Sequence, residues 1–206
     1  MEYEKALLLA EQTMALLQPG CKLIEIAGSI RRKKADPNDI DIIAIPDLRS
    51  PRPTFGCPAY QTTLDAILAS LVRGDEDEFL IHLNLNGPKL KSFTVSQDGG
   101  QHWLIDVDLY LCTPPSDWGV LKLIRTGPKE FSHWIVAQKY MGGGLPNGYQ
   151  VEDNRVINRT TKEYMPCPEE INFLKFCKLD WIAPSIRRPI WQRSVRHIDV
   201  RQPVKY

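Results

Sequence analysis

Two aspartates, Asp39 and Asp41, stand in an apolar stretch, residues 39–45, that has the composition of a buried strand. Residues two apart on a strand point to the same face, so the two carboxylates are expected side by side. Burying an unpaired carboxylate costs several kcal/mol, and neighbouring carboxylates also repel each other. A bound divalent cation is the usual relief for such a pair. The spacing therefore predicts a metal site at this point of the chain.

Small and basic residues follow the apolar segment just upstream, residues 23–27. Gly28 and Ser29 open a turn there, and Arg31 and Arg32 come directly behind it. Small residues let backbone N–H groups approach a ligand closely, and arginine side chains grip phosphate oxygens through paired hydrogen bonds. Together with the aspartate pair, this turn predicts a site for a nucleoside triphosphate and its metal.

A further apolar segment carries carboxylates at alternate positions. In residues 103–111 the charged side chains are Asp106 and Asp108, and their spacing again places them on one face of a strand. Two such strands fit one sheet with a shared acidic edge. The residues alone leave both Asp106 and Asp108 open as the third carboxylate of the site.

The bulk composition is that of an ordinary globular chain. The 206 residues include 26 basic and 25 acidic side chains, for a net charge of +1, so attraction of nucleic acid must come from local patches. No apolar run approaches the roughly 20 residues of a membrane span, and the N-terminus lacks the pattern of a signal peptide. The five cysteines are odd in number and form no Cys-x-x-Cys pair, which favours reduced thiols in a cytoplasmic protein.

Periodicity predicts the order of the elements. Apolar residues at helical spacing predict helices over 3–17, 60–73, 119–125, 129–141 and 168–177. Apolar runs predict strands over 22–27, 39–45, 79–85, 90–95 and 102–111, the last three in meander order, and a hairpin of 149–151 with 155–157. A proline-rich loop is expected over 46–58, and a connector over 114–118. The pattern indicates a mixed α/β (α+β) fold.

Taken in chain order, these segments resemble the catalytic core of the family X DNA polymerases, in the polymerase beta superfamily of nucleotidyltransferases. The matching motifs are Gly28-Ser29 with Arg31-Arg32, Asn38-Asp39-Ile40-Asp41, Val107-Asp108-Leu109, Thr126-Gly127-Pro128, and the C-terminal set of Glu169-Glu170, Leu179-Asp180-Trp181-Ile182, Pro184 and Arg187. The resemblance covers roughly residues 3–188. It is to the small viral and bacterial members without a lyase domain, so we expect no lyase activity.

The resemblance implies that the chain is divided into three parts. Residues 1–115 would form the palm, a nucleotidyltransferase-type unit with a mixed sheet. Residues 116–188 would form a small α+β thumb. Residues 189–206 would be a basic tail, which either contacts DNA or is a packed or disordered end.

The resemblance also implies the catalytic carboxylates. Asp39, Asp41 and Asp108 would hold two Mg²⁺ ions, with Mn²⁺ as a substitute. The Val-Asp-Leu context favours Asp108 over Asp106, and the alternative role of Asp106 is to pair with a basic neighbour.

The nucleotide, on the same resemblance, would be bound by Gly28, Ser29, Arg32, Asn38, Thr126 and Gly127. Arg31 either shares this role or is a solvated or structural residue. The Gly127-Pro128 bond is expected to be cis, which proline makes much less costly than any other residue. Ile124-Arg125 departs from the aromatic pair that the family often places before Thr-Gly, which leaves the choice of sugar open.

The implied reaction is transfer of dNMP from a dNTP to the 3′-hydroxyl of a DNA primer. We expect a monomer that fills short gaps during DNA repair, on gapped or primer–template DNA, in the cytoplasm of a bacterium or of a virus-infected host. One alternative is a nucleotidyltransferase that is template-independent or acts on tRNA, protein or a small molecule. The other alternative is a catalytically silent module that binds DNA.

Overall fold

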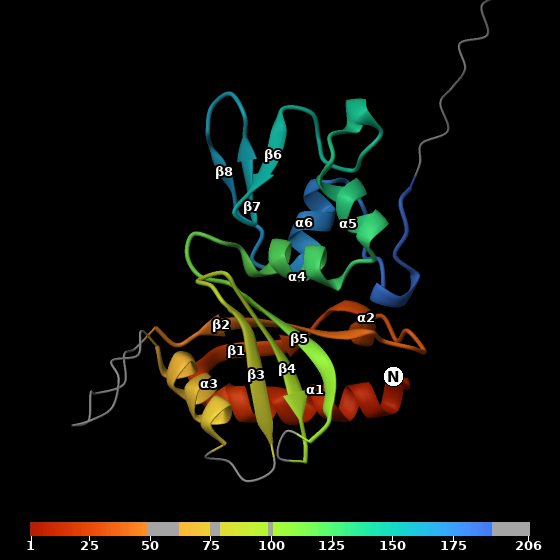
Figure 1. Cartoon of the computed structure of the whole chain (residues 1–206). Coiled ribbons are helices and arrows are strands. Elements are labelled where there is room, and N and C mark those ends of the chain that lie inside the picture. The colour runs from red at the N-terminus through yellow and green to blue at the C-terminus, as the bar shows by residue number, and fades with distance from the viewer. Residues whose placement is uncertain (49–61, 75–78, 99–100, 191–206) are drawn as a thin grey trace, which may run out of the picture.

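The computed structural model describes residues 1–48, 62–74, 79–98 and 101–190. Within these ranges, a five-stranded mixed sheet and a three-stranded antiparallel sheet combine with six α-helices (Figure 1). The predicted mixed α/β fold is therefore confirmed. Most of the expected proline-rich loop, Cys57 and the tail from residue 191 onward lie outside the described residues.

The larger sheet comes from the first half of the chain. Its strands are β1 (Cys21–Ile26), β2 (Asp39–Pro46), β3 (Leu80–Asn86), β4 (Leu90–Ser96) and β5 (Trp103–Leu111), in the order β1-β2-β5-β4-β3. The strands β3, β4 and β5 form the predicted antiparallel meander, whereas β2 and β5 run parallel. A parallel pair needs a long crossover connection, and here that connection includes α3 (Thr63–Arg73), β3 and β4.

One face of this sheet is covered by α3 and α1 (Tyr3–Leu17), which lie beneath it in Figure 1. Ile40, Ile42 and Ala44 of β2 are completely buried in this core, together with Leu9 and Leu68 of the two helices. Apolar residues at alternate positions of β2 thus fix which face of the strand is turned toward the helices.

The opposite face of the sheet meets α4 (Trp118–Thr126), the first helix of the second half of the chain. Ile43 of β2 is buried in an apolar cluster that includes Trp118 of this helix. Because strand residues alternate between faces, Asp39 and Asp41 lie on the same face as Ile43. The carboxylates are therefore on the α4 side of the sheet.

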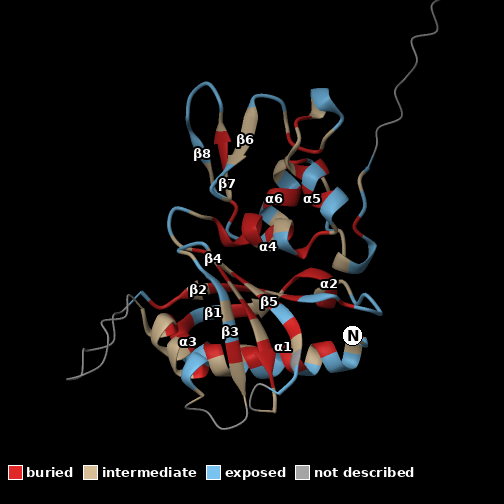
Figure 2. Cartoon of the chain, viewed as in Figure 1, coloured by how far each residue is buried: buried red, intermediate tan, exposed pale blue. Residues whose placement is uncertain are grey.

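A separate apolar core holds the elements after residue 118 together. These are α4, α5 (Lys129–Val136), α6 (Glu170–Phe176) and the small sheet of β6 (Tyr149–Glu152), β7 (Arg155–Asn158) and β8 (Tyr164–Met165). Figure 2 shows buried residues gathered where these elements face one another, with exposed residues along the outer turns. Fully buried members of this core include Val120, Phe131, Val156 and Phe173.

The predicted helix over 129–141 is too long, because α5 ends at Val136. Ala137 is extended, with ψ of 141°, and the chain turns back beside it. Gly143 allows this return, since a Cβ there would lie 2.0 Å from the carbonyl oxygen of Ala137. A 3-10 turn, η2 (Lys139–Met141), occupies the last three residues of the predicted helix.

The other predicted helices and strands are confirmed, with ends that differ by a few residues at most. The strand β8 is missed by the sequence pattern, because two residues are too few to show a period. No helix in the described ranges is both long and apolar enough to cross a membrane.

Gly119→Ala is expected to destabilise the protein. A Cβ at this position of α4 would lie 2.2 Å from the backbone carbonyl carbon of Glu169, which cannot move as a side chain can. Overpacking of this kind costs about 1–3 kcal/mol or more. The effect is measured as a lower midpoint of urea unfolding.

Gly144→Ala is the matched control, since its Cβ would meet side-chain atoms of Ile135 and Trp134 at 3.0 and 3.1 Å. Side chains can shift by a few tenths of an ångström, so this variant should lose less stability. Equal midpoints for the two variants would contradict the close backbone approach at Gly119.

Candidate functional site

Parallel pairing of β2 with β5 brings four aspartates side by side. Asp39 lies opposite Asp106, and Asp41 lies opposite Asp108, in the register of the two strands. All four project from the face of the sheet that is turned toward α4. The predicted catalytic carboxylates Asp39, Asp41 and Asp108 therefore lie close together in space, although α3, β3 and β4 come between them in the sequence.

Asp41 is the most perturbed of these carboxyl groups. Burial is the largest cause of a rise in its pKa to about 7, and the charges of Asp39 and Asp108 act in the same direction. The guanidinium groups of Arg32 and Arg125 oppose the rise. A carboxylate held among like charges is one that a bound cation would stabilise.

Asp106 has a different environment from Asp108. It is exposed, and its Oδ1 accepts a hydrogen bond of 2.6 Å from the hydroxyl of Thr94. Its partner is thus a hydroxyl, where the sequence suggested a basic neighbour. The charges that raise the pKa of Asp41 are those of Asp39 and Asp108, so the geometry favours Asp108 as the third carboxylate.

Gly28, the first residue of α2 (Gly28–Arg31), packs directly against Asp41. Its φ is +56°, and a Cβ there would lie 1.8 Å from Oδ2 of Asp41, so only glycine fits. The N–H of Ala27 donates to the carbonyl oxygen of Asp41 at 2.8 Å, which ties the turn to β2. The next side chain, Ser29, is buried, and its Oγ has no hydrogen-bond partner among the described residues. An unpartnered buried hydroxyl beside this contact fits a bound polar ligand.

Arg32 links the turn to the end of α4. Its Nη1 donates to the carbonyl oxygen of Thr126. Burial lowers the pKa of Arg32, while the nearby carboxylates of Asp41 and Asp39 act in the opposite direction. A Cβ at Gly127 would lie 2.9 Å from the same Nη1, so the structure brings Arg32, Thr126 and Gly127 together.

Arg31 is half-buried and forms an ion pair with the buried Glu170 of α6. Its guanidinium donates to the two carboxylate oxygens of Glu170 at 2.8 and 2.5 Å, and to the hydroxyl of Thr126 at 2.5 Å. Arg187 reaches Oε1 of the same carboxylate at 3.0 Å. Glu170 and Arg187 are only 3% and 4% exposed. Of the roles that the sequence left open for Arg31, the contacts support the structural one.

The sequence also singles out the Gly127-Pro128 bond, Asn38 and Ile124. The Gly127-Pro128 bond is cis, as expected, and Gly127 has a φ of +70°. Asn38 is exposed and directly precedes β2. Ile124, one of the two departures from the family pattern, packs against the apolar core of the second half of the chain.

The sequence does not assign Tyr110 or Arg125 to the site. The hydroxyl of Tyr110 donates to Oδ2 of Asp108 at 3.2 Å, and Cζ of Arg125 lies 4.0 Å from the centroid of the Tyr110 ring. The spacing of two between Asp108 and Tyr110 was an available signal, because it puts both on one strand face. The approach of Arg125 from α4 has no signal in the local sequence.

The donor set suits Mg²⁺, a hard cation that prefers oxygen ligands. Asp39, Asp41 and Asp108 offer carboxylate oxygens, and their mutual repulsion favours a cation between them. In the described part of the chain, no three acidic, histidine or cysteine side chains converge as a formed metal cage. The suitability of this site for Mg²⁺ is therefore argued from the charge of the carboxylates and from their oxygen donors.

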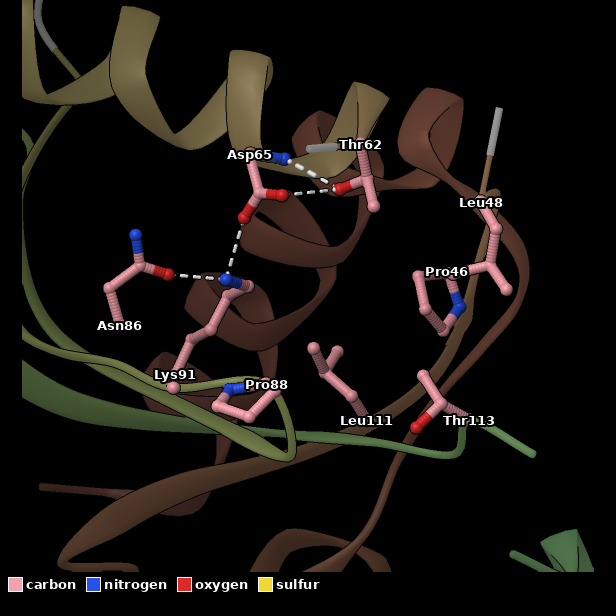
Figure 3. Close-up of a pocket in the computed structure, with 10 residues that line it drawn as sticks. Pro46, Leu48, Thr62, Asp65, Asn86, Pro88, Lys91, Leu111 and Thr113 are labelled. Carbon is pink, nitrogen blue, oxygen red and sulfur yellow. Dashed lines mark hydrogen bonds and ion pairs between the residues drawn. The ribbon is translucent and has the colours of Figure 1, made fainter. Parts of the chain in front are cut away.

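A cavity of about 620 Å³ lies on the other side of the sheet, beside α3 (Figure 3). Lys91 and Asp65 line it and form an ion pair of 2.7 Å, and Lys91 also donates to Oδ1 of Asn86. The hydroxyl of Thr62 donates to Oδ2 of Asp65 at 2.8 Å. The two charges neutralise each other, so this cavity has less to offer an anionic ligand than the acidic face and its arginines.

Comparison with known proteins assigns the chain to no family. No family model matches the chain, and no curated protein matches it. The residues of the acidic face and their geometry are therefore the basis on which a function can be proposed.

Glu170→Gln is expected to lower the free energy of unfolding by about 3–5 kcal/mol, because it leaves the buried guanidinium of Arg187 and the half-buried guanidinium of Arg31 without an anion. Burial raises the pKa of Glu170, but the hydrogen bonds and charges of Arg31 and Arg187 lower it overall. The ion pair therefore stabilises the fold fully above the ordinary pKa of 4.5. This stability is lost as the pH falls through the lower pKa of the folded state. Urea unfolding across the acid range should show this loss in the wild type and not in the variant.

Glu163→Gln is the control for that experiment, since Glu163 is exposed. It should unfold as the wild type does at every pH. A Glu170→Gln variant as stable as the wild type at neutral pH would contradict the buried ion pair.

Asp41→Asn is expected to stabilise the protein in metal-free buffer at alkaline pH. The pKa of Asp41 is raised from 3.8 to about 7, so its ionised form costs stability that is absent below the first value and complete above the second. The gain should be about 1–3 kcal/mol above neutral pH and vanish in acid. It is measured by urea unfolding with a chelator present. Asp36→Asn, at an exposed position, is the control, and a less stable Asp41→Asn at alkaline pH would contradict the repulsion.

Proposed function

We propose that the protein is a nucleotidyltransferase of the DNA polymerase type. It adds dNMP from a dNTP to the 3′-hydroxyl of a DNA primer and fills short gaps. The observation that carries the proposal is the meeting of Asp39, Asp41 and Asp108 with the turn that holds Gly28 and Arg32. Carboxylates for metal ions and a basic turn for phosphates are the two parts that phosphoryl transfer requires.

The acidic face would hold the metal. Asp39, Asp41 and Asp108 are the residues that would bind two Mg²⁺ ions, or Mn²⁺ in their place. Bound there, the ions supply neutralisation of the phosphate charge and a lower pKa for the attacking hydroxyl. The pKa of Asp41 favours this role, because a cation relieves the repulsion that raises it.

The turn would hold the nucleotide. Arg32 adds positive charge for the triphosphate, and its contact with Thr126 fixes the direction of its guanidinium group. The unpartnered hydroxyl of Ser29 is available to donate to a terminal phosphate. A nucleotide held by Arg32 would lie beside Thr126 and Gly127, the second turn that the resemblance assigns to nucleotide binding.

The partners of this reaction are a dNTP and gapped or primer–template DNA, bound by a monomer. We place the reaction in the cytoplasm of a bacterium or of a virus-infected cell. Cys21, Cys112, Cys167 and Cys177 are free and buried, which fits a reducing compartment.

Asp41→Asn and Asp108→Asn are each expected to reduce single-nucleotide incorporation into gapped DNA by about 10²-fold or more, since each removes one carboxylate that stabilises the transition state. Asp106→Asn should keep most of the activity, because Asp106 is exposed and bonded to Thr94. The assay is extension of a labelled primer with Mg²⁺ and each dNTP.

Wild-type incorporation by Asp108→Asn, or loss of incorporation only in Asp106→Asn, would mean that Asp106 and not Asp108 is the third carboxylate. Transfer of the nucleotide to tRNA, protein or a small molecule but not to DNA would support the first alternative activity. Binding of gapped DNA with no incorporation by the wild type would support a silent DNA-binding module.

A further inference from the structure

We propose that Tyr110 and Arg125 position Asp108 for metal binding, an inference that rests on the proposed function and adds two residues to it. Both lie outside the motifs that carry the resemblance. They connect the acidic face of the sheet to the last turn of α4.

Tyr110 contacts Asp108 directly. It lies two residues farther along β5, on the same face, and its hydroxyl donates to Oδ2 of Asp108 at 3.2 Å. A carboxylate has about four sites that accept hydrogen bonds, so one donor orients the group and leaves the other sites for a cation. Partners behind a metal ligand commonly fix its orientation in this way.

Arg125 in turn contacts Tyr110. Its guanidinium carbon lies 4.0 Å from the ring centroid, which is stacking distance for a cation on an aromatic face. Arg125 is exposed, and its charge also acts on Asp41 and on Tyr110. The pair therefore fixes the ring and offsets part of the negative charge of the acidic face.

The phenol suits this task because it has one proton to donate, and Asp108 is the acceptor of that hydrogen bond. A cavity of about 320 Å³ beside the ring is lined by Tyr110, Arg125, Val151 and Asn154. The pair thus borders the acidic face through Asp108, and it also lines this cavity together with Val151 of β6.

The test measures metal binding apart from activity. Mn²⁺ is titrated into the full-length protein, and the free ion is followed by electron paramagnetic resonance. Tyr110→Phe removes the hydroxyl alone and should weaken Mn²⁺ binding about three- to tenfold, the ratio that one hydrogen bond supplies. Arg125→Lys keeps the positive charge but loses the planar group that stacks on the Tyr110 ring, so it should weaken Mn²⁺ binding in the same direction.

Incorporation into gapped DNA gives the second readout. Tyr110→Phe should raise the Mg²⁺ concentration for half-maximal rate and lower kcat, with KM for dNTP unchanged. Tyr164→Phe is the matched control, since its hydroxyl also donates to an aspartate, Asp117, but in the second half of the chain. This control should leave both metal curves at the wild-type position.

Metal curves of Tyr110→Phe identical to those of the wild type would overturn the inference and leave the proposed function standing. Metal curves of Arg125→Lys identical to those of the wild type would overturn the part assigned to Arg125. A wild type that neither binds Mn²⁺ nor incorporates nucleotide would overturn both proposals. Should Tyr110→Phe fail to fold by thermal melting, the metal curve of Arg125→Lys decides the question.

Discussion

The repulsion between carboxylates on neighbouring parallel strands is the constraint on which this structure depends. β2 and β5 pair because their apolar residues fill a core on each face, and this register places Asp41 opposite Asp108. The pairing buries the apolar side chains of both strands, and it also holds the like charges of Asp41 and Asp108 close together. Packing energy from the core thus maintains an arrangement that its own electrostatics opposes.

The two arginines of the turn have different partners. Arg32 faces the carboxylates, while Arg31 is committed to Glu170 in the second half of the chain. Thr126 receives a hydrogen bond from each, through its carbonyl oxygen and its hydroxyl. The position of α4 and the position of the turn are therefore not independent. A shift of α6 would therefore move Arg32 as well, through the contacts of Arg31 and Thr126.

Much of the fold could be predicted from the sequence because its signals are local. The strand around Asp41 is apolar on both faces, and the meander and α1 have clear periods. The end of α5 could not be predicted, since it depends on the contact between Gly143 and Ala137. Within the site, spacing alone predicts the pair of Asp39 and Asp41 but leaves Asp106 and Asp108 open as the third carboxylate. The separate partners of Arg31 and Arg32, and the stacking of Arg125 on Tyr110, depend on tertiary packing.

Gly28 carries a consequence for how this chain can change over time. The space where its Cβ would be is filled by the carboxylate of Asp41, at 1.8 Å. A single added methyl group would have to displace that carboxylate, although Gly28 itself binds no metal and carries no charge. Substitutions at positions 28 and 41 are thus coupled. Genetic drift at the first is restricted by the side chain at the second, and neither can be diversified alone in a library without altering the acidic face.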